Sequence, residues 1–243
     1  MCRRVGGAAL LLVLAFAGCG GGGSGGGPTQ GASPGGIWRG SETAGGLAIT
    51  GLVTESGLAD FIRADDAQFV GQLSTTNELL SGAGEAFAQA GNTFPDGSTH
   101  GEWQISGTLQ ERNSIASQLT LTTDNGTTTQ ATLDLVFDPL YDQPSSLAAV
   151  SGSYVPPGGG FALSIDATGG LQLSDLICQT SGHIVIIDPT YNVYQVTMTS
   201  TCDHGGTSTA SGLATLDASL SPQQLLIGVT GAASSGVTAW QRQ

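Results

Sequence analysis

From Ile37 onward the chain alternates short runs of Val, Ile, Leu and Thr with Gly, Asp, Asn and Pro. Such runs, partly alternating between apolar and polar residues, predict β-strands separated by turns. The expected strands fall into two series: 36–41, 48–55, 59–64, 68–75, 101–109, 114–123 and 128–137, then 149–155, 161–166, 171–176, 178–187, 193–201, 210–217, 225–229 and 237–241. Only residues 78–90 (ELLSGAGEAFAQA) show the pattern of a helical turn, which two glycines weaken.

Strands at this spacing predict an all-β protein, built as antiparallel barrels or sandwiches. The two series also resemble each other in short matches kept in order. These matches are Trp103–Gly107 with Cys178–Gly182, Ser117–Thr122 with Tyr194–Thr199, Ala131–Asp134 with Ala214–Asp217, and Gly36-Ile37-Trp38 with Gly152-Ser153-Tyr154. We therefore expect two tandem modules, residues 37–145 and 146–243, that meet near residues 139–147.

The first residues have the pattern of an export signal. Arg3 and Arg4 precede an apolar run over residues 5–17, which is too short to span a bilayer, and small residues lead into Cys19. Phe16-Ala17-Gly18-Cys19 resembles the lipobox of bacterial lipoproteins. This resemblance implies that residues 1–18 are removed and that Cys19 carries the lipid chains, palmitate among them. Residues 19–36 would then form a flexible Gly-rich linker.

Other motifs resemble those of uncharacterised proteobacterial lipoproteins. They are Gly152-Ser153-Tyr154 in an opening strand, Cys178-Gln179-Thr180-Ser181-Gly182, Cys202, and Gly212-Leu213-Ala214-Thr215-Leu216. This resemblance spans nearly all of the chain after the signal and implies no particular activity. Gly36-Ile37-Trp38, followed by about eight strands, also resembles the small barrels of the lipocalin and avidin type.

Charge narrows the possible partners. Six arginines and no lysine oppose 19 acidic residues, for a formal net charge of −13. An acidic chain repels phosphate backbones and anionic membranes, so we expect no nucleic-acid partner. Contact with a membrane would then depend on the N-terminal lipid.

Two of the four cysteines remain after the signal and the lipid site are set aside. Cys178 and Cys202 form an even pair in an exported chain, which favours a disulfide between them. The alternative is a metal site that includes His183 or His204, but no Cys-x-x-Cys spacing supports it. We expect no metal and no cofactor.

No group of residues has the spacing of a catalytic motif. His100, His183 and His204 lie outside any nucleophile motif, although a triad is recognised by geometry and stays open. Asp65 and Asp66 read as a solvated turn. A loose calcium site would draw on Asp203, Asp60 or Asp66. Trp38, Trp103 and Trp240 are expected in cores, with an aromatic ligand platform as the alternative.

These patterns leave three functional hypotheses. The first is a non-catalytic, lipid-anchored module of the cell envelope that binds a protein, a glycan or a small apolar ligand. The second is a structural or assembly subunit of an envelope complex, and the third is a secreted hydrolase. Because Gly20 rather than Asp follows Cys19, the lipoprotein resemblance implies the outer membrane, with the periplasmic or cell-surface side left open.

Overall fold

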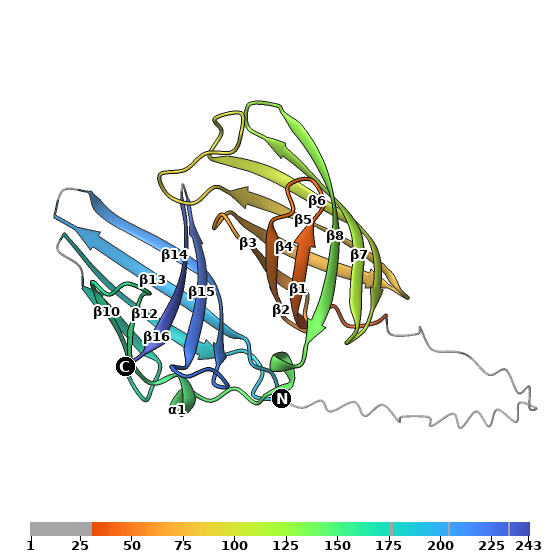
Figure 1. Ribbon diagram of the computed structural model, residues 1–243. Helices are drawn as coiled ribbons and strands as arrows, with labels where there is room; N and C mark the ends of the chain where they lie inside the picture. Colours follow the sequence, from red (N-terminus) through yellow and green to blue (C-terminus); the bar gives the residue numbers. More distant parts are fainter. Residues whose placement is uncertain (1–30, 175–176, 204, 233) are drawn as a thin grey trace, which may run out of the picture.

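The computed structural model describes residues 31–174, 177–203, 205–232 and 234–243. It contains two closed antiparallel β-barrels in tandem (Figure 1). The first barrel comprises β1 (Gly36–Glu42), β2 (Ala48–Val53), β3 (Leu58–Arg63), β4 (Gln68–Thr76), β5 (Leu79–Phe87), β6 (His100–Gln110), β7 (Ser114–Thr123) and β8 (Thr128–Asp138). The second comprises β9 (Gly152–Val155), β10 (Ala162–Ile165), β11 (Gly170–Ser174), β12 (Cys178–Ile186), β13 (Tyr194–Cys202), β14 (Gly206–Asp217), β15 (Gln224–Gly231) and β16 (Ser234–Arg242). The predicted all-β fold is confirmed, and of the two architectures left open the modules are barrels.

Each barrel closes by pairing its last strand with its first. β8 pairs with β1 over six residues, from Ile37 opposite Asp138 to Glu42 opposite Leu133. β16 pairs with β9 at only two positions, Val155 with Gln241 and Tyr154 with Arg242. The side chain of Arg242 reinforces this short closure, because its guanidinium donates to the carbonyls of Ala149 and Ser151.

The alternation along the strands places apolar side chains inside each barrel and polar ones outside. In β6, Trp103, Ile105 and Leu109 are buried, whereas Glu102 and Gln104 are exposed. The two interiors form separate hydrophobic cores, one around Trp38 and Trp103 and one around Tyr154, Tyr194 and Trp240. The core positions expected for the three tryptophans are confirmed.

The helical turn expected at residues 78–90 is wrong. Leu79–Phe87 is strand β5, which pairs with β4 and β6 along its whole length. Gly84 of β5 is required by close backbone approach, because a Cβ there would lie 2.0 Å from the Val70 carbonyl oxygen. On the neighbouring strand β4, a Cβ at Gly71 would lie 2.8 Å from the Trp103 ring. The same segment that looks like a poor helix is therefore a strand, and its glycine lets the backbone of β4 approach closely.

The sequence matches between the two halves agree with the barrels only in part. Trp38 and Tyr154 both lie in first strands, and each donates its side-chain hydrogen bond to a carbonyl four residues earlier, at Pro34 (3.0 Å) and Val150 (2.8 Å). The remaining matches pair β6–β8 with β12–β14, which occupy different places in their barrels because β8 closes on β1 whereas β14 pairs with β15. Trp103 and Cys178 are therefore not equivalent positions.

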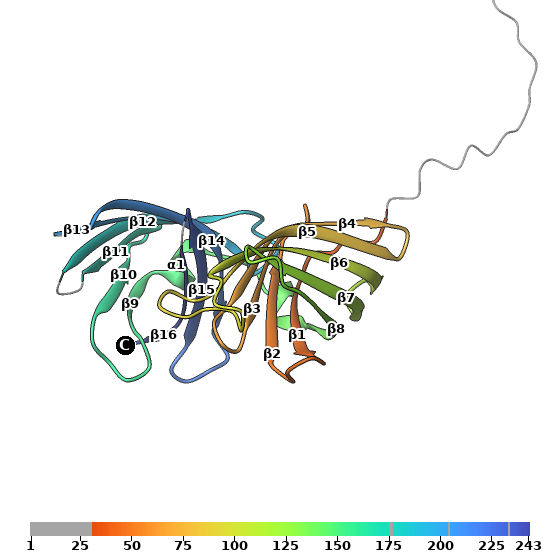
Figure 2. The same cartoon turned by 90° about the horizontal axis from the view of Figure 1, so that it is seen from above.

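The two barrels lie side by side (Figure 2) and contact each other. The link between them contains a 3-10 turn, η1 (Pro139–Asp142), and a short helix, α1 (Leu147–Val150). Outward-facing apolar residues of both barrels meet the turn in a third hydrophobic cluster, which contains Ile37, Leu52, Leu140, Tyr141, Val193 and Leu213. The faces that meet belong to β2–β4 and to β14 and β15.

Asn192 provides a buried polar link at this interface. Its Nδ2 donates to the carbonyls of Leu140 (3.3 Å) and Leu216 (2.7 Å), and its Oδ1 accepts from the Leu216 amide (3.4 Å). The side chain is 3% exposed. One amide thus satisfies backbone groups of the linking turn and of the second barrel together.

We expect Asn192→Ala to lower the free energy of unfolding by about 2–3 kcal/mol, because it leaves buried carbonyl and amide groups without partners. Urea titration followed by far-ultraviolet circular dichroism measures this loss. Asn113→Ala, which removes only an exposed bond to Gln110, is the control and should stay within about 0.5 kcal/mol of the wild type. Equal effects of the two substitutions would contradict the role given to Asn192.

Candidate functional site

The first barrel has a hollow at one mouth, of about 390 Å³. The hairpins β1–β2, β3–β4 and β7–β8 and the loop between β5 and β6 surround it. We call it the cup. Its lining residues are Glu42, Ala44, Gly45, Leu47, Arg63, Asp65, Phe69, Thr93, Phe94, Pro95, Leu119, Leu121, Thr129, Gln130 and Ala131.

The wall of the cup is mostly apolar. Phe69 on β4 and Leu119 and Leu121 on β7 point into the barrel and belong to its hydrophobic core, so the cup wall and the core are continuous. Phe94 comes from the loop between β5 and β6 and is 3% exposed, so this loop places an aromatic ring over the mouth. The size and lining match those of pockets that hold small organic ligands.

One arginine stands in this apolar wall. Arg63, the last residue of β3, donates from Nε and Nη2 to the two carboxylate oxygens of Asp65, both at 2.8 Å. Its Nη1 lies 3.5 Å from Glu42 Oε1, and its guanidinium lies 5.6 Å from the centre of the Phe69 ring. Burial alone would raise the pKa of Asp65, but the hydrogen bonds and charge of Arg63 outweigh it and hold that pKa below its ordinary value.

The loop over the cup is held by hydrogen bonds to both barrels. Asp96 accepts hydrogen bonds from Thr123 Oγ1 and from the Ser98 amide (3.0 Å), which lower its pKa to about 2, and its carbonyl accepts from Asn125 Nδ2 (3.0 Å). On its other side the loop meets the second barrel. There Ser235 Oγ of β16 donates to the Ala88 carbonyl at 3.0 Å. The second barrel therefore helps to hold the cover of the first barrel's cup.

The opposite end of the first barrel is closed by the incoming chain. Ala32 packs against the barrel core, and its carbonyl accepts a hydrogen bond from Thr75 Oγ1. Trp38 is fully buried behind this segment and bonds to Pro34. In Figure 1 the chain joins the barrel at the end away from the loop between β5 and β6, so the cup opens away from the N-terminal segment.

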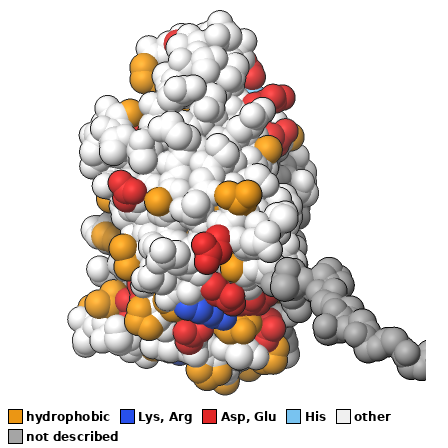
Figure 3. Space-filling view, turned by 90° about the vertical axis from the view of Figure 1, so that its right-hand side faces the viewer, with side chains coloured by type: hydrophobic (Ala, Val, Ile, Leu, Met, Phe, Trp, Pro, Cys, Tyr) orange, Lys and Arg blue, Asp and Glu red, His pale blue; other side chains and the backbone are white. Residues whose placement is uncertain are grey.

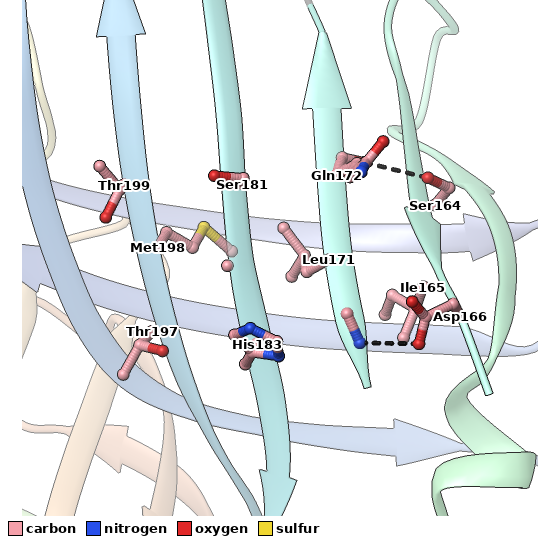
Figure 4. Close-up of a pocket in the computed structure, with 12 residues that line it drawn as sticks. Ser164, Ile165, Asp166, Leu171, Gln172, Ser181, His183, Thr197, Met198 and Thr199 are labelled. Atoms are coloured by element: carbon pink, nitrogen blue, oxygen red, sulfur yellow. Dashed lines mark hydrogen bonds between the residues drawn. The ribbon is translucent and has the colours of Figure 1, made fainter. Parts of the chain in front are cut away.

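The second barrel carries a larger but open hollow of about 640 Å³ on the outer face of β10–β13 (Figure 4). Its exposed side chains are polar, and they include Ser181, His183 and Thr197. Asp166 is engaged locally, because it accepts hydrogen bonds from Thr168 Oγ1 (2.7 Å) and the Gly170 amide (2.9 Å), which lower its pKa. This hollow is a twisted, solvated sheet surface and lacks the enclosed apolar wall of the cup.

The residues predicted from sequence fall in separate places. Cys178 and Cys202 lie opposite each other on β12 and β13 and form the expected disulfide. Cys19 and His204 lie outside the described residues. His100 Nδ1 is 3.0 Å from Asp124 Oδ1, and the ring packs on Phe87 rather than on a hydroxyl group. Within the described ranges, no three His, Cys, Asp or Glu side chains group as metal ligands.

The sequence interpretation of Asp65 and Asp66 is half right. Both residues lie in the β3–β4 turn, where Asp66 has a φ of 62°. Asp65, however, also forms an ion pair with Arg63 in the cup wall, which the interpretation as a solvated turn does not include. The spacing Arg63-x-Asp65 across a tight turn is the signal that could have indicated an ion pair at the barrel mouth.

Comparison with known proteins adds no assignment. No family model matches the chain, and no curated protein matches it significantly. A structure of a provisionally named outer membrane protein from Bacteroides fragilis aligns over 81% of this chain and 88% of that chain, at 12% identity and a TM-score of 0.24. A likeness of that degree carries no argument about function. In the part of the chain that the structure describes, none of the helices is long and apolar enough to cross a membrane.

A buried carboxylate lies between the barrels, on the same strand as Arg63. Asp60 on β3 is 1% exposed, and neither of its carboxylate oxygens has a hydrogen-bond partner. It faces Gly228 of β15, where a Cβ would lie 2.5 Å from Asp60 Oδ2 and 3.0 Å from Gln68 Oε1. Burial raises the pKa of Asp60 from 3.8 to about 7.

This shift predicts a pH dependence of stability. Between pH 4 and 7 the folded chain keeps a proton on Asp60 that the unfolded chain has lost, so the free energy of unfolding should fall by about 1 kcal/mol per pH unit as the pH rises. The contribution is complete below about pH 4 and is lost above pH 7. In urea titrations at several pH values, Asp60→Asn should remove this slope and be the more stable protein at pH 8. An unchanged slope in Asp60→Asn would assign the pH dependence to other groups.

Proposed function

We propose that this chain is a non-catalytic binding protein of the cell envelope, anchored by a lipid on Cys19, whose first barrel holds a small apolar ligand in the cup. The observation that carries the proposal is the cup itself: a hollow of about 390 Å³ at a barrel mouth, walled by Phe69, Phe94, Leu119 and Leu121. Apolar walls with few polar groups are the usual form of small-ligand sites.

The arrangement of the two barrels supports this proposal. Among the residues that the structure describes, only those of the first barrel combine a closed end, an apolar mouth and a covering loop, and the second barrel packs against that loop. The second barrel would then serve as a support. The outer faces are polar, with single exposed hydrophobic side chains such as Leu79 (64%) and Val136 (62%) on separate strands.

The assembly-subunit hypothesis has less support. A protein partner usually covers a contiguous apolar patch. In Figure 3 the hydrophobic side chains of the visible face are scattered among uncharged polar groups and acidic residues. A ligand inside the cup would cover the apolar side chains that line it.

Filling the cup tests the binding proposal. Ala131 lies on β8 in the cup wall, so Ala131→Phe should occupy the ligand's space. We expect the wild type to raise the fluorescence of N-phenyl-1-naphthylamine on binding, and Ala131→Phe to weaken this binding at least about tenfold. Ala83→Phe, on the exposed outer face of β5, is the matched control and should bind as the wild type does. If the wild type takes up no probe, or if both variants bind equally well, the cup is not the site.

The anchor requires a separate test. Cys19→Ala should leave the protein without lipid, because the modified thiol is gone, and should release it from membranes. Cell fractionation and metabolic labelling with palmitate measure the two effects. Continued membrane association of Cys19→Ala would overturn the lipid anchor while leaving the cup proposal intact.

A further inference from the structure

We infer that the cup selects ligands that carry a protonated amine beside an apolar body. The inference rests on the proposed function and adds the chemical class of the ligand. Three charged side chains line the cup, namely Glu42, Arg63 and Asp65, so two carboxylates share one guanidinium and one of them has only a long contact with it.

Glu42 is that carboxylate. It is the last residue of β1 and is 6% exposed, and its side chain lines the cup. Its one charged contact is Arg63 Nη1, at the long distance of 3.5 Å. A Cβ at Gly45 would lie 3.3 Å from Glu42 Oε1, so the backbone of the hairpin after β1 lies close to this carboxylate oxygen. The open direction for a donor is the cup.

Arg63 is already committed to another partner. Two parallel hydrogen bonds of 2.8 Å join it to Asp65, which is the strong bidentate geometry of an arginine–carboxylate pair. One guanidinium thus faces two carboxylates, so the group carries a surplus negative charge, and Glu42 has the longer of the two contacts. An anionic ligand would meet a satisfied guanidinium flanked by two carboxylates.

Filling the cup with an apolar body strengthens this preference. The ligand would displace water that solvates Glu42, and a buried charge without a partner is costly. A protonated amine on the ligand would give Glu42 a close partner of opposite charge. Primary alkylamines have pKa values of about 10, so they carry this charge at pH 7.

The charge of the whole chain acts in the same direction. With a formal net charge of −13 and no lysine, the protein attracts cations toward its surface and repels anions. This long-range attraction is weakened by salt, whereas pairing inside the cup is screened less. The preference for an amine should therefore persist at physiological ionic strength.

Three probes that share one aromatic body test the inference. Isothermal titration calorimetry at pH 7 in 0.15 M salt compares 1-naphthylmethylamine, 1-naphthalenemethanol and 1-naphthoic acid on the full folded chain. We expect the amine to bind at least about tenfold more tightly than the alcohol, and the acid to bind most weakly. Glu42→Gln, which keeps the side chain's shape, should bring the amine to the affinity of the alcohol.

Glu102→Gln is the matched control, because it makes the same change of charge on the exposed outer face of β6. It should leave the order of affinities unchanged, and circular dichroism verifies that both variants fold. Equal binding of the three probes, tightest binding of the acid, or an amine preference that survives in Glu42→Gln would overturn the inference while leaving the apolar cup in place. Absence of binding by all three probes would overturn the proposed function and the inference together.

Discussion

The closure of each sheet on itself is the constraint on which the rest of this structure depends. An eight-stranded barrel has an interior just wide enough for side chains to fill, so the sizes of the inward residues decide whether it is solid or hollow. In the first barrel Trp38 fills the end where the chain enters, and its indole nitrogen bonds to the Pro34 carbonyl. Trp103 lies opposite Leu121 of the cup wall and bonds to the Val70 carbonyl, so it fills the interior below the cup. At the other end Ala131 is small, and the space it leaves becomes part of the cup.

The second constraint is that the barrels pack against each other. Positions that would face water in an isolated barrel, such as Ile37, Leu52 and Leu213, are buried between them. The same packing buries the Asp60 carboxylate against Gly228. It also brings Ser235 of β16 to the loop that carries Phe94. The cup and the barrel interface are therefore parts of one connected structure.

The chemistry of the cup depends on an imbalance of charge in a largely apolar wall. Arg63 and Asp65 neutralise each other through a bidentate pair, and Glu42 remains with a single long contact. In a chain with six arginines, no lysine and 19 acidic residues, most carboxylates have no guanidinium to pair with. The placement of one guanidinium in the cup wall links the acidic composition of the protein to the ligand class that we propose.

The sequence by itself determined the strands, the two tandem modules and the disulfide, because alternation of apolar and polar residues and an even cysteine pair are local signals. It also placed Trp38 in a core and matched it to Tyr154 at the start of the second series. It misassigned residues 78–90, because helix-like composition there yields to pairing of β5 with both neighbours and to the space that Gly84 leaves at Val70. Only the tertiary structure decided the sites. Glu42, Arg63, Phe94 and Ala131 come from four separate segments, and no local pattern records that barrel closure brings them around one hollow. The same holds for Asn192 and Asp60, since their surroundings exist only once the two barrels have packed together.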